Sequence, residues 1–255
     1  MLTALALSLG LPHDASVDGW RVDRLMATTT IFVALMFAAT LIWILWSAWR
    51  HGPKHRADYD VGNAPKQIAK ALGLSLVIFG VVDGNLFVNG LDDLDNAFWD
   101  FGRAAADPAA VRIEVNAHQW AWDARYPGPD NQFGTPDDIV TLNDIRVPKG
   151  RPVVVELAAT DVLHSFALPN FRVKQDAVPG TINRLWWQAK ETGVFEIACA
   201  QHCGVNHYKM RGKLTVLEPE AYAAWAAEAS ALSQESYDPR DETAHWAWPW
   251  EKGSH

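Results

Sequence analysis

The stretch CAQHCGVNHYKM, residues 199–210, decides how this 255-residue chain is interpreted. It holds both cysteines of the sequence, together with two histidines and a methionine. A disulfide between the two thiols would close a ring with only three intervening residues, which constrains the unfolded chain little and therefore stabilises little. The pattern C-x3-C-x3-H-x2-M instead offers two thiolates, an imidazole and a thioether, which favours a bound metal.

The donor types in this loop indicate copper. Zinc and most iron sites do not recruit methionine, whereas copper, which is softer and redox-active, does. A single blue-copper ion uses two histidines, one cysteine and an axial methionine, so one cysteine here would be spare. Two cysteines bracketed by histidine and methionine suggest instead a pair of coppers that share both sulfurs. A further histidine is expected from a distant strand, and His164 in ATDVLHSFALPN is the candidate.

The loop lies between two segments with strand patterns, GVFEIACA (193–200) and GKLTVLE (212–218). Earlier segments of the same kind are VRIEVNA (111–117), IVTLNDIRVP (139–148), PVVVELAA (152–159) and TINRLWWQA (181–189). Turn-forming stretches such as YPGPDNQFGTPDD separate them, and several short strands at regular spacing predict a sandwich or barrel. Trp186 and Trp187 would then point one to the core and one to the surface. After Pro219, EAYAAWAAEASAL predicts a helix, and the final HWAWPWEKGSH shows no periodicity.

Two apolar segments near the N-terminus predict a membrane hairpin. Residues 26–49 carry no charge and are bracketed by Arg24 and Arg50, and the second span is expected at about 68–91 although it contains Asp83. Basic residues outnumber acidic ones in the loop between the spans, so the positive-inside rule places that loop in the cytoplasm. The N-terminal segment and everything after the second span then face the periplasmic side.

Charge and composition narrow the class of partner. The net charge of −8 and the pI near 5.5 argue against nucleic acid, whose phosphates need a basic surface. The acidity lies in the part after the second span, where it would attract a basic soluble protein. With only two cysteines, the chain does not fit a secreted disulfide scaffold, and it lacks the second C-x-x-C of a zinc ribbon.

Three motifs in a fixed order resemble subunit II of the haem-copper terminal oxidases, the subunit that carries the dinuclear Cu-A centre. They are HQWAWDARYP (118–127), DVLHSFALPNFRVKQDAVPG (161–180) and FEIACAQHCGVNHYKMRGKLTV (195–216). The resemblance implies a cupredoxin-like sandwich or barrel behind a two-helix transmembrane hairpin, with a short C-terminal helix. The expected domains are the N-terminal segment and hairpin at 1–91, the Cu-A domain at 92–218, and the helix and tail at 219–255.

The resemblance also implies the ligands. The side-chain ligands would be His164, Cys199, Cys203, His207 and Met210, and Gln201 would contribute its backbone carbonyl. Both cysteines would bridge two coppers, with His164 and Met210 serving one and His207 and the carbonyl serving the other. His202, inside the same loop, is expected to point outward.

Trp120 occupies the position of the family's exposed tryptophan, through which electrons enter from cytochrome c. Trp122 is expected to pack inward, and His118 is expected to be structural. Asp161 resembles one of the family's acidic contacts with the electron donor.

Many oxidase subunits have glutamate where this chain has Gln201, and that glutamate ligates a magnesium ion at the subunit interface. Glutamine lacks the negative oxygen, which argues against magnesium here.

The predicted function is that of the electron-entry subunit of a haem-copper respiratory complex in a bacterial-type inner membrane. It would act in a cytochrome c oxidase whose oxygen chemistry is on another chain. Its partners would be catalytic subunit I, further subunits, and cytochrome c or a fused or bound cytochrome. The alternatives are the Cu-A subunit of a nitric oxide reductase and a membrane-anchored copper-delivery protein. The Cu-A domain of nitrous oxide reductase is disfavoured by the membrane hairpin.

Overall fold

The computed structural model describes residues 10–56, 59–238 and 240, which form two compact units. The helical unit contains residues 21–95. The β unit combines residues 12–20 with the chain from residue 96 onward, and it holds every strand that the described residues form. Residues 241–255 lie outside the described residues, and they include the segment HWAWPWEKGSH (245–255), which the sequence leaves unassigned.

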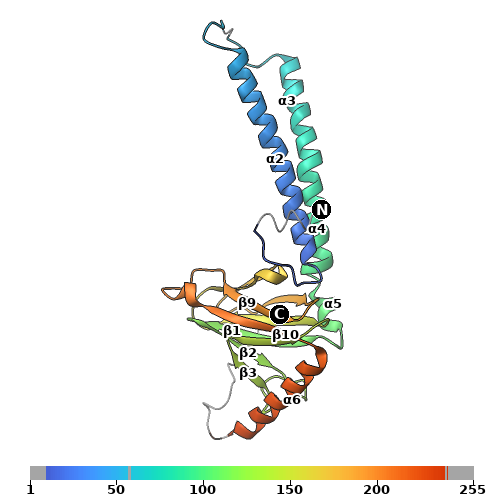
Figure 1. The fold of residues 1–255 in the computed structure, drawn as a ribbon, viewed down its shortest axis with the longest axis vertical. Coiled ribbons are helices and arrows are strands. Elements are labelled where there is room, and N and C mark those ends of the chain that lie inside the picture. Colours follow the sequence, from blue (N-terminus) through green and yellow to red (C-terminus); the bar gives the residue numbers. More distant parts are fainter. Residues whose placement is uncertain (1–9, 57–58, 239, 241–255) are drawn as a thin grey trace. The chain divides into compact units, whose positions relative to one another are not determined.

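The helical unit is a hairpin whose two arms run in opposite directions (Figure 1). Its elements are α2 (Gly19–Arg50), α3 (Pro65–Ile78), η1 (Phe79–Asp83) and α4 (Gly84–Asp93), the last three forming one continuous arm. Both arms are long and apolar enough to cross a membrane, and the apolar window of each is 0% buried. A helix that is apolar on all sides needs either a large protein core or lipid around it. The two predicted spans lie inside these arms.

The two arms are joined at one end by ion pairs, which we call the Arg–Asp clamp (Arg21, Arg24, Asp92 and Asp93). The carboxylate of Asp93 accepts hydrogen bonds from Nη1 of Arg21 at 2.9 Å and from Nη2 of Arg24 at 3.2 Å. Asp92 pairs with Arg21 at 3.3 Å. Because Asp93 is only 4% exposed, two guanidinium groups compensate one buried charge, and the pairing fixes the register of the arms at this end.

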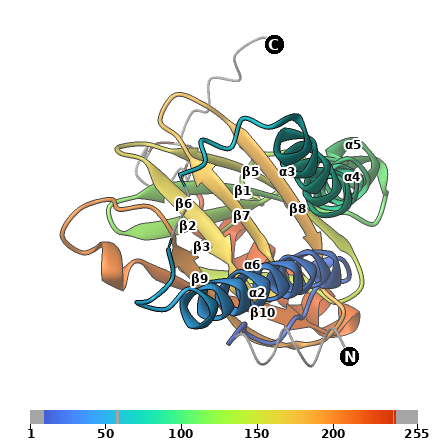
Figure 2. The same ribbon diagram turned by 90° about the horizontal axis from the view of Figure 1, so that it is seen from above.

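The β unit consists of two five-stranded sheets, and all their strands except β4 are labelled in Figure 2. The first has the order β3-β2-β1-β5-β8, with β3 (Ile139–Leu142), β2 (Ala121–Tyr126), β1 (Val111–His118), β5 (Pro152–Ala159) and β8 (Asn183–Gln188). The second has the order β4-β10-β9-β6-β7, with β4 (Asp144–Pro148), β10 (Arg211–Leu217), β9 (Gly193–Cys199), β6 (His164–Leu168) and β7 (Val173–Ala177). The predicted sandwich is therefore confirmed.

One predicted strand is wrong, because residues 139–148 form two strands that belong to different sheets. The chain turns at Asn143, which has φ of 55°, a left-handed conformation that asparagine tolerates better than most residues. Its backbone N–H donates to the carbonyl of Trp122 at 2.8 Å, and its side-chain oxygen accepts from the Trp122 N–H at 2.9 Å. Strands β2, β6 and β7 were not predicted, since their short runs lack clear alternation.

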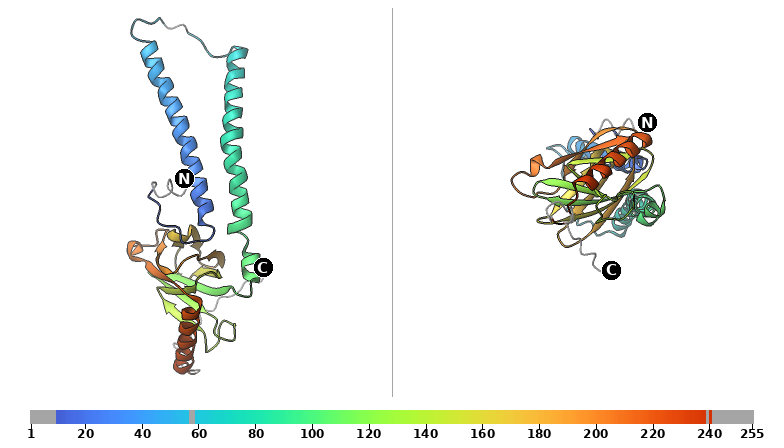
Figure 3. Two further views of the ribbon diagram at one scale, coloured as in Figure 1. Left: turned by 45° about the vertical axis from the view of Figure 1, so that its right-hand side comes forward. Right: turned by 90° about the horizontal axis from the view of Figure 1, so that it is seen from below.

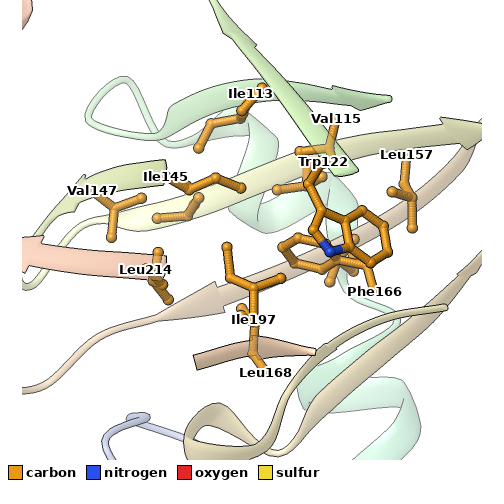
Figure 4. Close-up of a cluster of buried hydrophobic side chains, with 14 of the residues drawn as sticks. Ile113, Val115, Trp122, Ile145, Val147, Leu157, Phe166, Leu168, Ile197 and Leu214 are labelled. Carbon is orange, nitrogen blue, oxygen red and sulfur yellow. The ribbon is translucent and has the colours of Figure 1, made fainter. Parts of the chain in front are cut away.

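The core fills the space between the two sheets with alternate side chains from facing strands (Figure 4). Those labelled there include Ile113, Val115, Trp122, Ile145, Leu157, Phe166, Ile197 and Leu214. Each of these side chains is at most 1% exposed. At roughly 25 cal/mol per Å² of apolar surface removed from water, this layer is the main source of the stability of the β unit.

The expectation that Trp186 and Trp187 divide between core and surface is wrong. Trp187 is 2% exposed in the main core, and Trp186 is 8% exposed on the opposite face of β8. The outer face is covered because helix α5 (Phe101–Ala106) packs there and forms a second cluster with Trp186. A sequence pattern for one strand does not show that a helix covers its outward face.

Residues 12–20, which we call the N-terminal strap, pair with the edge of β8. Ser16 forms an antiparallel bridge with Ala189, and the N–H of Val17 donates to the carbonyl of Gln188 at 2.9 Å. Ala15 is fully buried in the core of the β unit. The strap therefore belongs to the sandwich although it precedes the first arm of the hairpin.

At the other end of the β unit, helix α6 (Pro219–Ser236), drawn in red in Figure 3, follows β10. It contacts β3, β4 and β10.

Candidate metal centre

Three neighbouring strands bring the predicted ligands to one edge of the second sheet. His164 is the first residue of β6, Cys199 is the last residue of β9, and Met210 directly precedes β10. Strand β9 lies between the other two, pairing through Cys199 with Phe166 of β6 and along its length with β10. The sheet order thus gathers residues that are far apart in sequence, and the loop from residue 200 to 210 closes over them.

The five predicted side-chain ligands lie in mutual contact. The sulfurs of Cys199 and Cys203 are 3.8 Å apart, and both cysteines are free. The sulfur of Cys203 lies 3.6 Å from Nδ1 of His207 and 3.7 Å from Sδ of Met210. The same Sδ is 3.2 Å from Nδ1 of His164. Within the described part of the chain, His164, Cys199 and Cys203 are the one group of three or more potential His, Cys or carboxylate ligands with all donor atoms within 4.8 Å.

This arrangement fits the copper pair that the sequence predicts. Ligand atoms sit about 2.0–2.3 Å from a first-row metal, so two atoms on one ion can be at most about 4.6 Å apart. All the donor separations above meet that limit. Three sulfurs and two imidazole nitrogens form a soft set that suits copper better than magnesium or calcium. The backbone carbonyl of Gln201 also faces the site, 3.2 Å from the sulfur of Cys199, whereas the residue itself is exposed.

The electrostatics of the pair of cysteines favour a bound cation. Burial, together with the neighbouring Cys199, raises the pKa of Cys203 to about 12. Two thiolates 3.8 Å apart would repel each other, and water would solvate that of Cys203 poorly, since this residue is 3% exposed. A metal ion supplies the opposite charge, and it displaces the thiol protons when it binds.

Asp161, the predicted acidic contact with the electron donor, is exposed, and its carboxylate also contacts the predicted ligand His164. Its Oδ1 lies 2.8 Å from Nε2 of His164, and its Oδ2 accepts from the N–H of Gln119 at 2.6 Å. Burial alone would raise the pKa of Asp161, but these hydrogen bonds and one from the Val162 N–H hold it below its usual range. A carboxylate at Nε2 keeps the proton on that nitrogen and leaves Nδ1, the atom beside Met210, free to bind a metal.

Trp120 is half-buried against the ligand loop. Its indole Nε1 donates to the carbonyl of Cys203 at 3.2 Å, and the amide of Gln119 donates to the same carbonyl at 2.8 Å. Gly204 follows with φ of 118°, and a Cβ there would lie 2.8 Å from the Gln119 amide nitrogen. A larger residue at 204 would therefore displace the side chains that hold the loop. The hydrogen bond of Trp120 thus goes to the backbone of the ligand loop.

The remaining candidates behave largely as expected. Trp122 packs inward with 0% exposure, its ring 6.2 Å from that of His164. His118 pairs with Asp123 at 3.2 Å. His202 is exposed and stacks on the His207 ring at 5.6 Å.

The sequence did not reveal two of the contacts that support the site. Gln119 was not identified at all, although it holds both the ligand loop and the Asp161 carboxylate. Asp161 was identified as an acidic contact with the electron donor, and its additional contact with His164 was not foreseen. The spacing of three residues between Asp161 and His164 was the available signal, because a tight turn before a strand can fold such a pair together.

Comparison with known proteins gives a consistent result. Residues 111–216 match the family model described as cytochrome C oxidase subunit II, periplasmic domain. The chain is 29% identical over 236 residues to the alternative cytochrome c oxidase subunit 2 of Bradyrhizobium diazoefficiens, covering 83% of this chain and 81% of that protein. It is 40% identical over 222 residues to the cytochrome c oxidase subunit 2 of Alkalihalophilus pseudofirmus, covering 85% and 60%.

Among solved structures, the chain is similar to the periplasmic domain of subunit II of cytochrome oxidase (CoxB) of Bradyrhizobium japonicum. The identity is 29% and the TM-score is 0.43, with 48% of this chain and 94% of that domain covered.

Proposed function

The chain belongs to the cytochrome c oxidase subunit II family, and from this we propose that its β unit binds a Cu-A centre and is the electron-entry point of the oxidase. The observation that carries the proposal is the contact among the donor atoms of His164, Cys199, Cys203, His207 and Met210. Bound there, a copper pair would supply a one-electron redox couple shared between two metals. The oxygen chemistry would take place on the catalytic subunit.

The chain's own residues would keep this site rigid and partly dry. His164, Cys203 and Met210 are at most 3% exposed, so one side of the site lies against the core. Cys199 and His207 are half-buried, which leaves the other side nearer to solvent. Asp161 orients His164, and the carbonyl of Cys203 is held by two donors from the β1–β2 turn. Such fixed supports limit rearrangement when the charge of the site changes.

Trp120 is the proposed entry residue for electrons. Its half-exposed indole touches the ligand loop through the hydrogen bond to the carbonyl of Cys203, which gives a short covalent and hydrogen-bonded path to a ligand. A basic cytochrome would be steered to this region by the acidic balance of the chain, −8 overall. Magnesium is not part of the proposal, because Gln201 supplies no carboxylate.

The N-terminal strap supports the proposed arrangement in the membrane. Because residues 12–20 pair with β8, the chain before the first arm and the chain after the second lie on the same side of any bilayer that the hairpin crosses. The basic loop between the arms then lies on the other side, which supports a cytoplasmic loop and a periplasmic copper site in an inner membrane. The relatives reported above are cytochrome c oxidase subunits, which does not favour the nitric oxide reductase alternative.

The test is copper reconstitution of the full-length chain in detergent. We expect two coppers per chain and a mixed-valence spectrum from one unpaired electron shared by both. One copper per chain, or zinc bound more tightly than copper, would contradict the proposal. The full chain is required, because a fragment starting after the hairpin would lack the strap that pairs with β8.

A further inference from the structure

The second arm of the hairpin contains a carboxylate within its apolar stretch. Asp83 is the last residue of the π-helical turn η1, where the N–H of Gly84 bonds to the carbonyl of Phe79. Its side chain caps no helix, and it has no hydrogen bond or ion pair with any residue that the structure describes. It is exposed, as are Val81 and Phe87 on either side.

The Arg–Asp clamp provides a reference position from which the depth of Asp83 in a bilayer can be derived. Asp93 in the clamp marks the outer end of the arm, and Lys70 marks the start of the uncharged stretch at its inner end. At 1.5 Å per residue, Asp83 is about 15 Å from Asp93 and about 20 Å from Lys70. Since the hydrocarbon core of a bilayer is about 30 Å thick, Asp83 lies at least about 10 Å inside its outer edge. With Lys70 at the inner edge of the hydrocarbon layer, this spacing puts Asp83 inside the layer and not at its surface.

A carboxylate at that depth needs a partner. Exposure to lipid is costly for a charged side chain, and such residues almost always face another protein segment or a polar cavity. The first arm does not provide the partner. The half-buried positions Ile78, Val82, Leu86 and Asn89 recur on the face that leads to Asp93 and the clamp, whereas Asp83 is exposed and lies off that face.

The local backbone leaves room for a close neighbour. Gly80 lies in the same π turn as Asp83, and a Cβ placed on it would meet nothing within 4 Å. Glycine at such a position allows another helix backbone to approach closely, which shortens the reach from the carboxylate to a donor.

We propose that Asp83 docks this subunit onto the catalytic subunit, accepting a hydrogen bond or ion pair from a donor side chain on one of its membrane helices. The inference rests on the proposed function, since that function supplies a membrane partner. The donor is an arginine, lysine, histidine, tyrosine, tryptophan, serine or threonine, the side chains able to donate to a carboxylate. Asp83 is a docking residue here and takes no part in binding copper.

The test uses the intact complex, purified in detergent through a tag on the catalytic subunit. Asp83→Leu should lower the fraction of subunit II that copurifies by about threefold to tenfold, the range expected for one interhelical polar contact in a membrane. Asp83→Asn, which still accepts a hydrogen bond, should lose less. The matched control is Asn89→Leu, because the Asn89 amide already donates to the carbonyl of Asn85 at 2.8 Å and needs no external partner.

Copurification of Asp83→Leu at the wild-type level would overturn the inference, as would an equal loss in Asn89→Leu. A photo-crosslinking residue in place of Phe87 identifies the neighbour. An adduct with the catalytic subunit supports the proposal, whereas an adduct only with a second copy of this chain or with lipid contradicts it. Failure of the wild-type chain to copurify would instead count against the proposed function, and the copper spectrum of the same preparation reports on that separately.

Discussion

Tryptophan side chains are placed oppositely in the two units. In the β unit Trp122 is fully buried and Trp187 is 2% exposed, whereas in the hairpin Trp43 is 68% exposed and Trp49 is 81% exposed. The β unit folds in water and encloses its apolar groups. The hairpin is surrounded by hydrocarbon, where exposure of an indole carries no such penalty, and ring systems near the ends suit the interface. A low exposed fraction of a tryptophan side chain therefore indicates stabilising burial in the β unit but not in the hairpin.

Polar groups show the reverse difference. In the β unit, Asp161 and Gln119 find their partners within the chain and use them to support the metal centre. In the hairpin, Asp93 is satisfied by the clamp, but Asp83 is not satisfied by any described residue. The β unit thus supplies the supports of its own site, whereas the proposed docking of Asp83 would complete the hairpin with another protein. The following predictions test that contrast.

The largest effect is expected from Cys199→Ser. A hydroxyl is a poor copper ligand, so the variant should lose the shared-electron spectrum and bind fewer than two coppers. It should also lose the stabilisation that bound metal provides, about 4 kcal/mol at a thousandfold excess over Kd. Metal analysis, electron paramagnetic resonance and thermal unfolding measure these changes. Val205→Ala, in the same loop but 82% exposed, should keep both coppers, and a similar loss there would point to general disruption of the loop.

A second test compares one residue type in the two units. Phe171 is fully buried and packs edge-on against Phe195 with ring centres 5.0 Å apart, so Phe171→Ala should destabilise the β unit by about 3–5 kcal/mol. Phe87 in the hairpin is 66% exposed, and Phe87→Ala should change the unfolding of the β unit by less than about 0.5 kcal/mol. Denaturant unfolding followed by near-ultraviolet circular dichroism measures both. Equal effects would mean that the two units do not fold independently.

A smaller effect is expected from Asp161→Ala. Without the carboxylate, Nε2 of His164 loses its partner and the ring loses its fixed orientation, which should weaken copper binding about 10–100-fold. Asp161→Asn should recover part of the affinity, because its amide oxygen can still accept from Nε2. Competition with a copper chelator gives the affinities. Unchanged binding in Asp161→Ala would leave Asp161 with only a surface role.

The smallest structural effect is expected from Trp120→Phe. The carbonyl of Cys203 keeps its hydrogen bond from Gln119, so the loss in stability should not exceed about 1 kcal/mol, and the copper spectrum should hardly change. Electron entry from the natural cytochrome should nevertheless slow markedly, as measured by stopped-flow reduction. Wild-type rates should also fall as salt is added, because added ions screen the acidic surface. A Trp120→Phe variant that is reduced at the wild-type rate would exclude this entry route.

The sequence was most informative where chemistry is local. The loop from 199 to 210 contains its own metal pattern, and each strand next to it alternates clearly. The break at Asn143 was not predictable in the same way, because both halves of 139–148 read as strand and only the left-handed backbone separates them. Covering of Trp186 by α5 and the role of Gln119 depend on contacts between distant segments, which no local pattern encodes.

Pairing of the N-terminal strap with the last strands of the first sheet also has a consequence for biogenesis. Lys190 and Asp14, which form an ion pair of 2.7 Å, are separated by 176 positions in the chain. Ribosomes make the strap first, so it must be exported ahead of the first arm and wait until both arms are inserted and β8 has been translated. Such a long-range contact closes late in folding. The sandwich therefore acquires its final edge only after both arms have been inserted. The strap can pair with β8 only when both segments lie on the same side of the membrane, so this pairing depends on the correct orientation of the newly made subunit.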